Sequence, residues 1–590
     1  MPFTDPHSYV DIEQGKIKHI DFVITTHFKE RTLHVVASYT LDRPVTGPLF
    51  LDIRDINIEY IRQDEEELAW EIDREDPILG QRLHIKDLDQ ATELTIGCST
   101  SPEASALQWL KPGRTAGGKH PFLYSQCQAL HARSIFPCQD TPSIRFTYSA
   151  VFETPPPLVP VMGAAIVEEE LSILTNFRRF DMQQPIPSYL FALVVGNLGF
   201  YRLGPRCGVY AEPEAIDDAA WEFAENEDKL VEAEKLYGPY VWERYDIIVL
   251  PPSFPYGGME NPRLTFLNPL YLVGDRSLTT IITHELAHAW TGNLVTNATW
   301  EDFWLNEGWT TYAEARITEA IEGRDIAQLK AATSRSILLE DMNRYGMDST
   351  LTCLTYPVEG LDPDEIFSSI PYHKGKALLE RMEQAVGRTV FDEFIHKYIN
   401  TFKFQSLTTS GFLAFVDQEL PQVREKVNLE EWIYQPGLPE DAPTYSSTLL
   451  EQVTSVVKGF MDGKRPTQEE IDGWEPPQIP IFLRMLPHEI PTDDCHYLDD
   501  LFKFKDSQNV VNLTYFYVIA LHSDYRDVMP RIESLLANFG RHFLTSKVYR
   551  AMVQVDWARD EARPIFERYR ERHHPITVAY IDNLLKEAGL

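Results

Sequence analysis

The stretch HELAHAWTGNLVTNATWEDFWLNEG, residues 284–308, lies where two predicted helices, 277–292 and 307–322, follow one another. Positions i and i+4 of a helix share one face, so His284 and His288 can bind one zinc ion, with Glu285 beside it as a base. The HExxH pattern also arises by chance, so alone it is only suggestive. Glu307, 19 positions after His288, supplies a third ligand if the two helices pack together. Two imidazoles and one carboxylate leave a fourth place open for water, as in catalytic zinc sites.

Such a site predicts hydrolysis at a carbonyl carbon. Zinc lowers the pKa of its water toward about 7, Glu285 takes the proton, and the hydroxide attacks the polarised carbonyl. The oxyanion then needs a donor opposite the metal, and a tyrosine would serve, but spacing cannot choose among 27 tyrosines. Glu314, seven residues after Glu307, is either a hydrogen-bond partner of a ligating histidine or a plain surface acid.

Composition limits the classes of partner and the number of domains. At 590 residues the chain is too long for one core, and about three or four domains are expected. A net charge of -35 argues against nucleic acid or an anionic membrane as a partner. Six scattered cysteines without a CxxC pair predict reduced thiols and a cytoplasmic protein. The opening MPFTDPHSYVDIEQ lacks the pattern of a signal peptide, and no apolar run reaches the roughly 18 residues of a membrane span.

The pattern of apolar residues changes twice along the chain. In the first 200 residues, period-two alternation such as Leu33 to Tyr39 and Ile56 to Tyr60 predicts half-buried strands. From residue 214 a helical repeat ends at Gly238, and further helices are predicted at 277–292, 307–322, 326–344, 373–386 and 390–402. The Pro- and Gly-rich stretch YQPGLPEDAPTY, 434–445, is typical of a linker, and 446–590 is again helical.

These changes predict a multidomain α+β protein. The expected parts are a β-sheet domain over 1–200, an α/β catalytic domain over 201–434, a linker over 435–445 and an all-α domain over 446–590. Stacked helix pairs are expected in the last part, although it has no strict repeat.

The segment PSFPYGGMENPRL, residues 252–264, places a carboxylate, Glu260, behind two glycines. A glycine pair allows a turn, or the close approach of a backbone to another group. A turn would account for the glycines but not for Glu260, so the residues alone leave its role open.

Four stretches resemble the gluzincin metallo-aminopeptidases, and among them the leukotriene A-four hydrolase branch, whose members are zinc aminopeptidases and, in animals, epoxide hydrolases. The HELAH motif is followed after 18 residues by Glu307 and preceded by GGMEN. The similar stretches are 125–143, 249–266, 288–308 and 367–375, with a weaker one at 539–550. The resemblance implies a thermolysin-like catalytic domain between the β-sheet domain and a solenoid-like helical domain.

The same resemblance implies roles for residues that spacing could not select. Tyr372 would stabilise the oxyanion, and Glu260 would bind the free amine of a peptide substrate, with Gln126 and Gln128 in the same pocket. Gly257, Gly258 and Met259 would present backbone to the substrate, and Arg541 would meet its carboxylate. The pocket for the side chain would be formed by Tyr256, Trp300, Phe303, Phe367 and Asp364.

Two positions depart from the pattern of the branch. Phe543 replaces a lysine of the animal members, which predicts weaker recognition of a free C-terminus by about 1.5–3 kcal/mol, with Lys547 as the candidate to compensate. Phe367 replaces a pocket tyrosine next to Asp364, the acid tied to the epoxide reaction.

Three functions are therefore weighed. The first is an aminopeptidase with one zinc per chain that removes N-terminal residues from short peptides, acting as a monomer. The second is a lipid epoxide hydrolase with secondary peptidase activity. The third is a non-catalytic peptide-binding scaffold, against which the complete set of site residues argues. Glu260 argues against an endopeptidase, because an exopeptidase needs a group that recognises an N-terminal ammonium.

Overall fold

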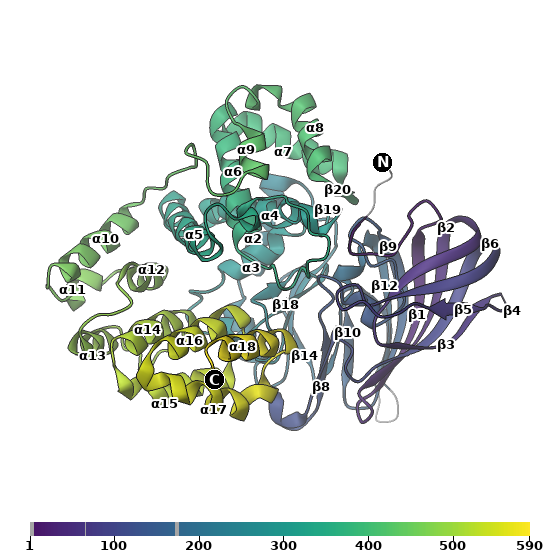
Figure 1. Ribbon diagram of the computed structural model, residues 1–590, viewed down its shortest axis with the longest axis horizontal. Coiled ribbons are helices and arrows are strands. Elements are labelled where there is room, and N and C mark those ends of the chain that lie inside the picture. The colour runs from purple at the N-terminus through teal and green to yellow at the C-terminus, as the bar shows by residue number, and fades with distance from the viewer. Residues whose placement is uncertain (1–4, 65, 172–175) are drawn as a thin grey trace.

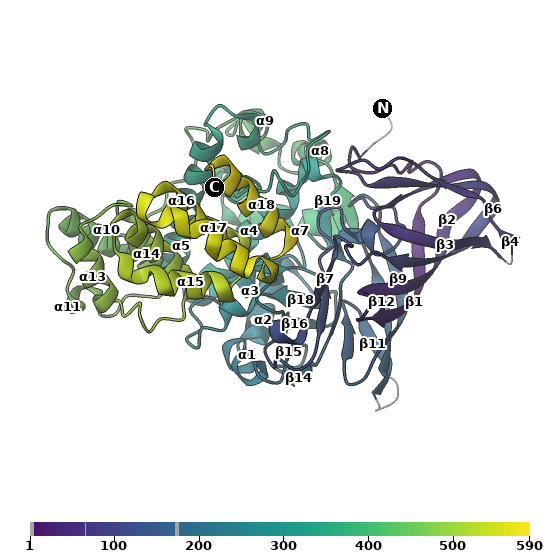
Figure 2. The ribbon, with the colours of Figure 1, turned by 60° about the horizontal axis from the view of Figure 1, so that its bottom comes forward.

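The computed structural model describes residues 5–64, 66–171 and 176–590. Residues 1–4 of the opening segment lie outside this part. Figure 1 shows a β-rich region at one end of the molecule, a mixed α/β region in the middle, and a helical region at the other end and below. Viewed from below, the C-terminal helices run across the front of the middle region (Figure 2). The predicted order of β-rich, α/β and all-α parts is confirmed.

The N-terminal region consists of two sheets. In the described residues the larger sheet has nine strands in the order β11-β12-β9-β1-β2-β6-β3-β4, with β5 beside β6. Their bounds are β1 (Ile17–His27), β2 (Thr32–Ile53), β3 (Ile56–Gln63), β4 (Glu66–Glu67), β5 (Trp70–Ile72), β6 (Gln81–Thr100), β9 (Phe146–Thr154), β11 (Ala165–Leu171) and β12 (Asn176–Ile186). The smaller sheet, β10-β13-β8-β7, contains β7 (Leu107–Leu110), β8 (Phe122–Ser125), β10 (Val159–Met162) and β13 (Leu193–Gly196). The alternation predicted from Leu33 to Tyr39 is present in β2, where every second side chain is buried.

The middle region is built on a third sheet with the order β14-β15-β16-β18-β17. Its strands are β14 (Gly199–Arg202), β15 (Cys207–Ala211), β16 (Tyr245–Val249), β17 (Gly258–Met259) and β18 (Leu264–Leu267). A short parallel pair is formed by β19 (Val295–Asn297) and β20 (Gln405–Leu407). Since β17 is the outermost strand of the third sheet, one of its edges pairs with β18 and the other is free of strand partners among the described residues.

The middle region also contains α-helices. They are α1 (Ile216–Glu222), α2 (Asn226–Tyr237), α3 (Thr280–Ala287), α4 (Trp304–Glu322), α5 (Arg324–Tyr345), α6 (Ile370–Val386), α7 (Arg388–Phe402), α8 (Thr409–Glu419) and α9 (Leu429–Tyr434). The helices predicted at 307–322, 326–344, 373–386 and 390–402 begin and end within three residues of α4, α5, α6 and α7.

Two helix predictions need correction. The repeat ending at Gly238 is two helices, because Phe223 leaves helical geometry (φ -102°, ψ 16°) to bury its ring in the core. The helix expected over 277–292 is shorter, since α3 ends with His288 as its C-cap residue (φ -54°, ψ -24°) and Gly292 follows with a positive φ of 112°. His288 keeps near-helical angles, so the i, i+4 relation to His284 survives.

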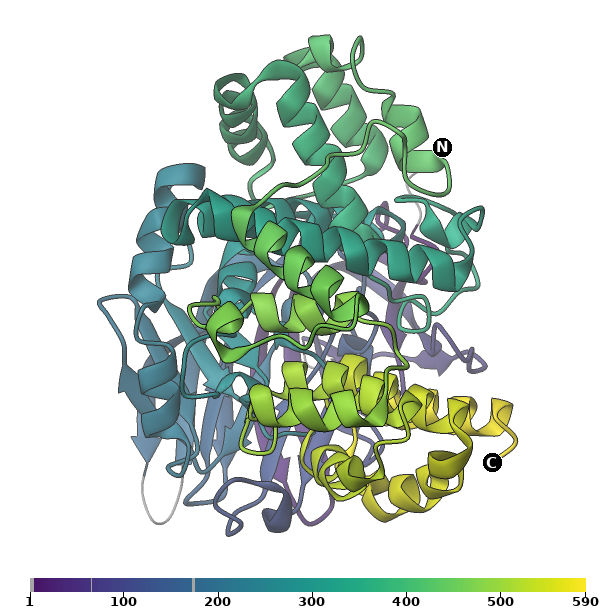
Figure 3. The same ribbon diagram turned by 90° about the vertical axis from the view of Figure 1, so that its left-hand side faces the viewer.

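The C-terminal region is all helical and has a hydrophobic core of its own, which also takes in Leu270, Tyr271 and Leu329 from the middle region. Its helices are α10 (Thr448–Met461), α11 (Gln468–Ile471), α12 (Gln478–Met485), α13 (Thr492–Leu501), α14 (Val510–His522), α15 (Met529–Asn538), α16 (His542–Gln554), α17 (Asp556–Tyr569) and α18 (Pro575–Glu587). In Figure 3 the first of these helices, in green, lie above the last ones, in yellow. No regular element lies between Tyr434 and Thr448. None of the helices in the described part of the chain combines the length and apolar content needed to cross a bilayer.

Candidate active site

Helices α3 and α4 bring three potential metal ligands to one buried point. Nε2 of His284 lies 3.2 Å from Nε2 of His288, and Oε2 of Glu307 lies 3.3 Å from the first nitrogen and 3.6 Å from the second. Ligand atoms held about 2.0–2.2 Å from one zinc ion in a tetrahedron are about 3.3–3.6 Å apart. The three atoms therefore have the separations that a single zinc ion requires.

The electrostatics of the donor set also fit a divalent cation. Oε2 of Glu307 and Oε1 of Glu260 are buried without a hydrogen-bond partner. Burial raises the pKa of Glu285 well above its ordinary value, and the nearby carboxylates of Glu260 and Glu307 raise it further. Gathering three carboxylates in one buried place is costly, and a bound divalent cation would offset that cost.

Each histidine has a partner on its other ring nitrogen. Oε2 of Glu314 lies 3.0 Å from Nδ1 of His284, and Oγ1 of Thr310 lies 3.2 Å from Nδ1 of His288. Such partners fix the tautomer and the orientation of a ligating imidazole. Sequence reasoning missed Thr310, although its position one turn after Glu307 on α4 was a signal that it faces α3.

Changing Glu314 to Gln is expected to weaken zinc binding by about 10- to 100-fold, because the neutral amide holds the His284 ring less firmly and makes it less basic. Titration with a competing chelator measures the affinity. Glu319→Gln is the matched control, since Glu319 lies on the same helix but is paired with Arg388. Equal affinities for the parent and Glu314→Gln would mean that the contact of Glu314 with His284 has no effect on metal binding.

Tyr372 reaches the site because α4 and α6 cross at two glycines. A Cβ on Gly308 would lie 2.9 Å from Cα of Gly375, and one on Gly375 would lie 2.8 Å from Cα of Gly308. The ring of Tyr372, near the start of α6, stacks on that of His284 at a centroid distance of 6.0 Å. Burial, together with the Glu307 and Glu260 carboxylates, raises the pKa of Tyr372 well above its ordinary value. Its hydroxyl is therefore held as a hydrogen-bond donor.

The glycine pair before Glu260 lets two side chains lie close to the backbone. Neither glycine has a positive φ. A Cβ on Gly258 would lie 2.2 Å from Oε1 of Glu285, and one on Gly257 would lie 2.5 Å from Oη of Tyr271. Only glycines leave room for these side chains beside the backbone.

Glu260 projects into the same place as the metal ligands. Its carboxylate lies within 4.8 Å of potential ligand atoms of Glu285 and His288. Burial, and then the charge of Glu307, raises its pKa to about 8. Gln126 is buried behind this point, where its Nε2 contacts Sδ of Met259 at 3.3 Å, and neither of these two residues lines the cleft.

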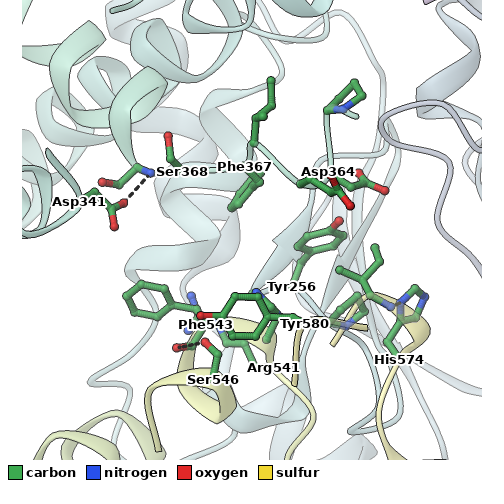
Figure 4. Close-up of a pocket in the computed structure, with 18 of the residues that line it drawn as sticks. Tyr256, Asp341, Asp364, Phe367, Ser368, Arg541, Phe543, Ser546, His574 and Tyr580 are labelled. Carbon is green, nitrogen blue, oxygen red and sulfur yellow. Dashed lines mark hydrogen bonds between the residues drawn. The ribbon is translucent and has the colours of Figure 1, made fainter. Parts of the chain in front are cut away.

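The site opens into a cleft of about 1570 Å³ between the middle region and the C-terminal helices. This volume exceeds the roughly 300–1,000 Å³ of common small-molecule pockets. The predicted pocket residues that line it are Gln128, Tyr256, Gly257, Gly258, Trp300, Phe303, Asp364, Phe367 and Arg541. Figure 4 shows Phe367 and Asp364 on one wall, and Arg541, Phe543 and Tyr580 on the wall formed by the C-terminal helices.

Asp364 is tied to another part of the chain. Its Oδ2 lies 2.8 Å from Nε2 of His131, whose Nδ1 lies 2.8 Å from Oγ of Ser105. Although burial would raise the pKa of Asp364, His131 keeps it below its ordinary value. His131 was missed because it is 233 residues from Asp364 and belongs to the N-terminal region.

Arg541 precedes α16 as its N-cap residue and lies close to Gly257 and Tyr271. Phe543 is 38% exposed in the cleft, where the wall has no charge at that position. Nζ of Lys547 lies 4.8 Å from the centre of the Phe543 ring and 3.4 Å from a carboxylate oxygen of Glu340. Since Glu340 already balances its charge, Lys547 is a poor replacement for a lysine at position 543.

Three family models match consecutive parts of the chain. The peptidase M1 N-terminal domain matches residues 17–190, the peptidase family M1 domain matches 221–432, and the C-terminal domain of leukotriene A4 hydrolase matches 474–585. The matched regions follow the order of the three structural parts.

Individual proteins match over nearly the whole length. A leukotriene A-4 hydrolase of Xenopus laevis is 35% identical, with 97% of this chain and 98% of that protein covered. A leucine aminopeptidase 2 of Neosartorya fischeri is also 35% identical, with 98% of each covered. The structure of a yeast LTA4 hydrolase in complex with bestatin is 30% identical and superimposes with a TM-score of 0.92 over 99% of this chain and 98% of that chain.

Proposed function

On the premise that this chain belongs to peptidase family M1, with a C-terminal domain of the leukotriene A4 hydrolase type, we propose that it is a zinc-dependent aminopeptidase acting on short peptides. The observation that carries the proposal is the carboxylate of Glu260, which is buried, has one oxygen without a hydrogen-bond partner, and offers a ligand atom within 4.8 Å of those of Glu285 and His288. An ammonium group held at Glu260 would place the first peptide bond of a substrate beside Glu285. A longer N-terminal extension would collide with Glu260, so one residue is removed at a time.

His284, His288 and Glu307 would hold zinc, with Glu314 and Thr310 orienting the histidines. Zinc supplies a Lewis acid that polarises a carbonyl and acidifies water. Glu285 accepts the proton of the attacking water and returns it to the leaving amine. Tyr372 donates a hydrogen bond to the oxygen that becomes negative in the transition state.

The remaining residues position the peptide. The free edge of β17 at Gly257 and Gly258, followed by Met259, can pair with an extended substrate backbone. Gln128, which lines the cleft, would lie near the amine, while Gln126 would act from behind through its contact with Met259, and Arg541 would meet a substrate carboxylate. The first side chain would contact Tyr256, Trp300, Phe303, Phe367 and Asp364.

A panel of aminoacyl reporter substrates tests this function. Free-amine reporters are expected to be hydrolysed. Their N-acetylated forms are expected to react more slowly by a factor of about 10² at least, because acetylation removes the cation that Glu260 binds. A chelator is expected to abolish hydrolysis and added zinc to restore it. Turnover that survives complete removal of metal, or equal rates for acetylated and free substrates, would contradict the proposal.

One observation favours a second candidate function. Asp364 lines the same cleft as the metal ligands and is held by His131, so a second carboxylate is fixed in position there for an epoxide substrate. Phe367 in place of a tyrosine weakens this case. Turnover of a leukotriene-type epoxide faster than of any peptide would make epoxide hydrolysis the main activity.

We also propose one zinc ion per chain, a monomeric state and a cytoplasmic location, the last supported by six buried and unpaired cysteines. The domain division at 1–200, 201–434, 435–445 and 446–590 is part of the same proposal. The irregular segment between α9 and α10 supports the linker, while the third sheet begins with β14 at Gly199, two residues before the proposed boundary.

A further inference from the structure

One face of α16 forms much of the cleft wall opposite α5. Its lining residues follow the first one at intervals of three, four, seven, eight and eleven positions, so they form one continuous face of the helix. These residues are Phe543, Ser546, Lys547, Arg550, Ala551 and Gln554. Arg541 stands at the start of this wall, beside the catalytic residues, and Arg550 stands nine residues further along it.

The cations of the cleft differ in whether a carboxylate contacts them. Arg484 and Lys547 both contact Glu340, at 2.8 Å and 3.4 Å, and Arg344 pairs with Asp341 at 3.3 Å. Arg550 donates a hydrogen bond to Oη of Tyr580 at 2.5 Å, and no carboxylate of the described residues lies within 4.0 Å of its guanidinium. In a chain with a net charge of -35, an unbalanced arginine that lines a cleft is unusual.

The surroundings of Arg550 strengthen the case for an anion. His542 lies beside it, and its ring meets that of Tyr580 at a centroid distance of 4.9 Å. Burial, and then the charges of Arg550 and Arg344, lowers the pKa of His542 to about 4. The imidazole is thus neutral, and Arg550 supplies the positive charge that no nearby carboxylate balances. Tyr580 projects into the cleft from α18, next to the wall residues (Figure 4).

Arg541 and Arg550 stand at different positions along this wall. The backbone of α16 advances about 13.5 Å over nine residues. The guanidinium of Arg550 points toward Tyr580, whose ring also contacts His542, the neighbour of Arg541. A carboxylate bound at Arg550 would belong to a longer peptide than one whose carboxylate reaches Arg541.

We propose that Arg550, with the hydroxyl of Tyr580, forms a second carboxylate-binding position in the cleft, which selects longer peptides than those anchored at Arg541. The inference rests on the proposed aminopeptidase function. The ligand is a carboxylate of the peptide, supplied by its C-terminus or by an acidic side chain at the same distance.

The test uses peptides of three to eight residues, each made with a free and with an amidated C-terminus. The kcat/KM of every peptide is measured for the parent enzyme and for Arg550→Gln. For the longer acids we expect kcat/KM to fall about tenfold in the variant, the effect of one charge-assisted hydrogen bond in a partly solvated place. Amidated peptides and the shortest acids are expected to be unaffected. Arg541→Gln is expected to show its acid-specific loss at shorter peptide lengths.

Two further variants and one further type of peptide show whether the charge of Arg550 causes the effect. Arg550→Lys is expected to recover part of the acid preference, because the charge remains but the guanidinium fork is lost. Arg484→Gln is the matched control, since Arg484 lines the same cleft but is balanced by Glu340. Amidated peptides that carry a Glu near the end distinguish a side-chain carboxylate from the C-terminus.

A loss in Arg550→Gln that is equal for acids and amides, or equal at all lengths, would overturn the inference, as would no loss at any length. Aminoacyl reporters without a carboxylate test the aminopeptidase function separately from the second carboxylate-binding position. If the parent does not hydrolyse them, the proposed function fails. If both enzymes hydrolyse them but acids and amides remain alike, only the second binding position is wrong.

Discussion

Replacing Glu285 with Gln is expected to lower kcat for aminoacyl reporters by about 10²–10⁴-fold, the usual contribution of a general base. The amide has nearly the same shape but cannot accept the proton of the attacking water. Glu285 lies against Gly258, where its carboxylate faces the metal ligands. Steady-state kinetics on the parent and the variant provide the measurement.

The zinc content separates loss of the base from loss of the metal. Glu285 does not belong to the set of His284, His288 and Glu307, so Glu285→Gln is expected to bind as much zinc as the parent, as measured by atomic absorption. An active variant, retaining a tenth or more of the parent kcat, would show that another group activates the water. If the inactive variant has also lost its zinc, Glu285 has a structural role in the metal site, and its role as a base is contradicted.

The parts of the fold that the sequence predicted depend on local periodicity. The alternation in β2 and the helical spacing in α4 to α7 are visible within a few residues, because each element buries one face. The relation between His284 and His288 is equally local, since it follows from one turn of α3. The interruption between α1 and α2 was missed because it depends on the burial of Phe223, which is a tertiary contact.

The other residues of the site are brought together by contacts between segments that are far apart in the sequence. Tyr372 was chosen by resemblance alone, because its place follows from the contact between Gly308 and Gly375 and from no local pattern. His131 meets Asp364 only after the N-terminal and middle regions pack together. Arg550 was not singled out either, since an arginine on a helix is normally solvated, and its lack of a carboxylate partner is visible only in three dimensions.

Replacing Glu260 with Gln is expected to lower kcat/KM for free-amine substrates by about 10²–10³-fold, within the range for removing one member of a buried charge pair. Oε1 of Glu260 has no hydrogen-bond partner, and burial and Glu307 raise its pKa to about 8, so the carboxylate is poorly stabilised by the protein itself. A substrate ammonium would provide the missing opposite charge. The amide in the variant keeps the shape but offers no charge.

The comparison with N-acetylated substrates decides what Glu260 does. If it anchors the amine, Glu260→Gln lowers the rates of free-amine substrates and leaves the slow rates of acetylated ones unchanged, so discrimination between them is lost. Glu365→Gln is the matched control, because Glu365 is an exposed acid that lines the same cleft. Equal losses for both substrate classes would instead mean that Glu260 supports the metal ligands, since its carboxylate lies within 4.8 Å of His288. In that case the glycines before it would still be needed for the approach of Glu285, but the restriction to one N-terminal residue would require another cause.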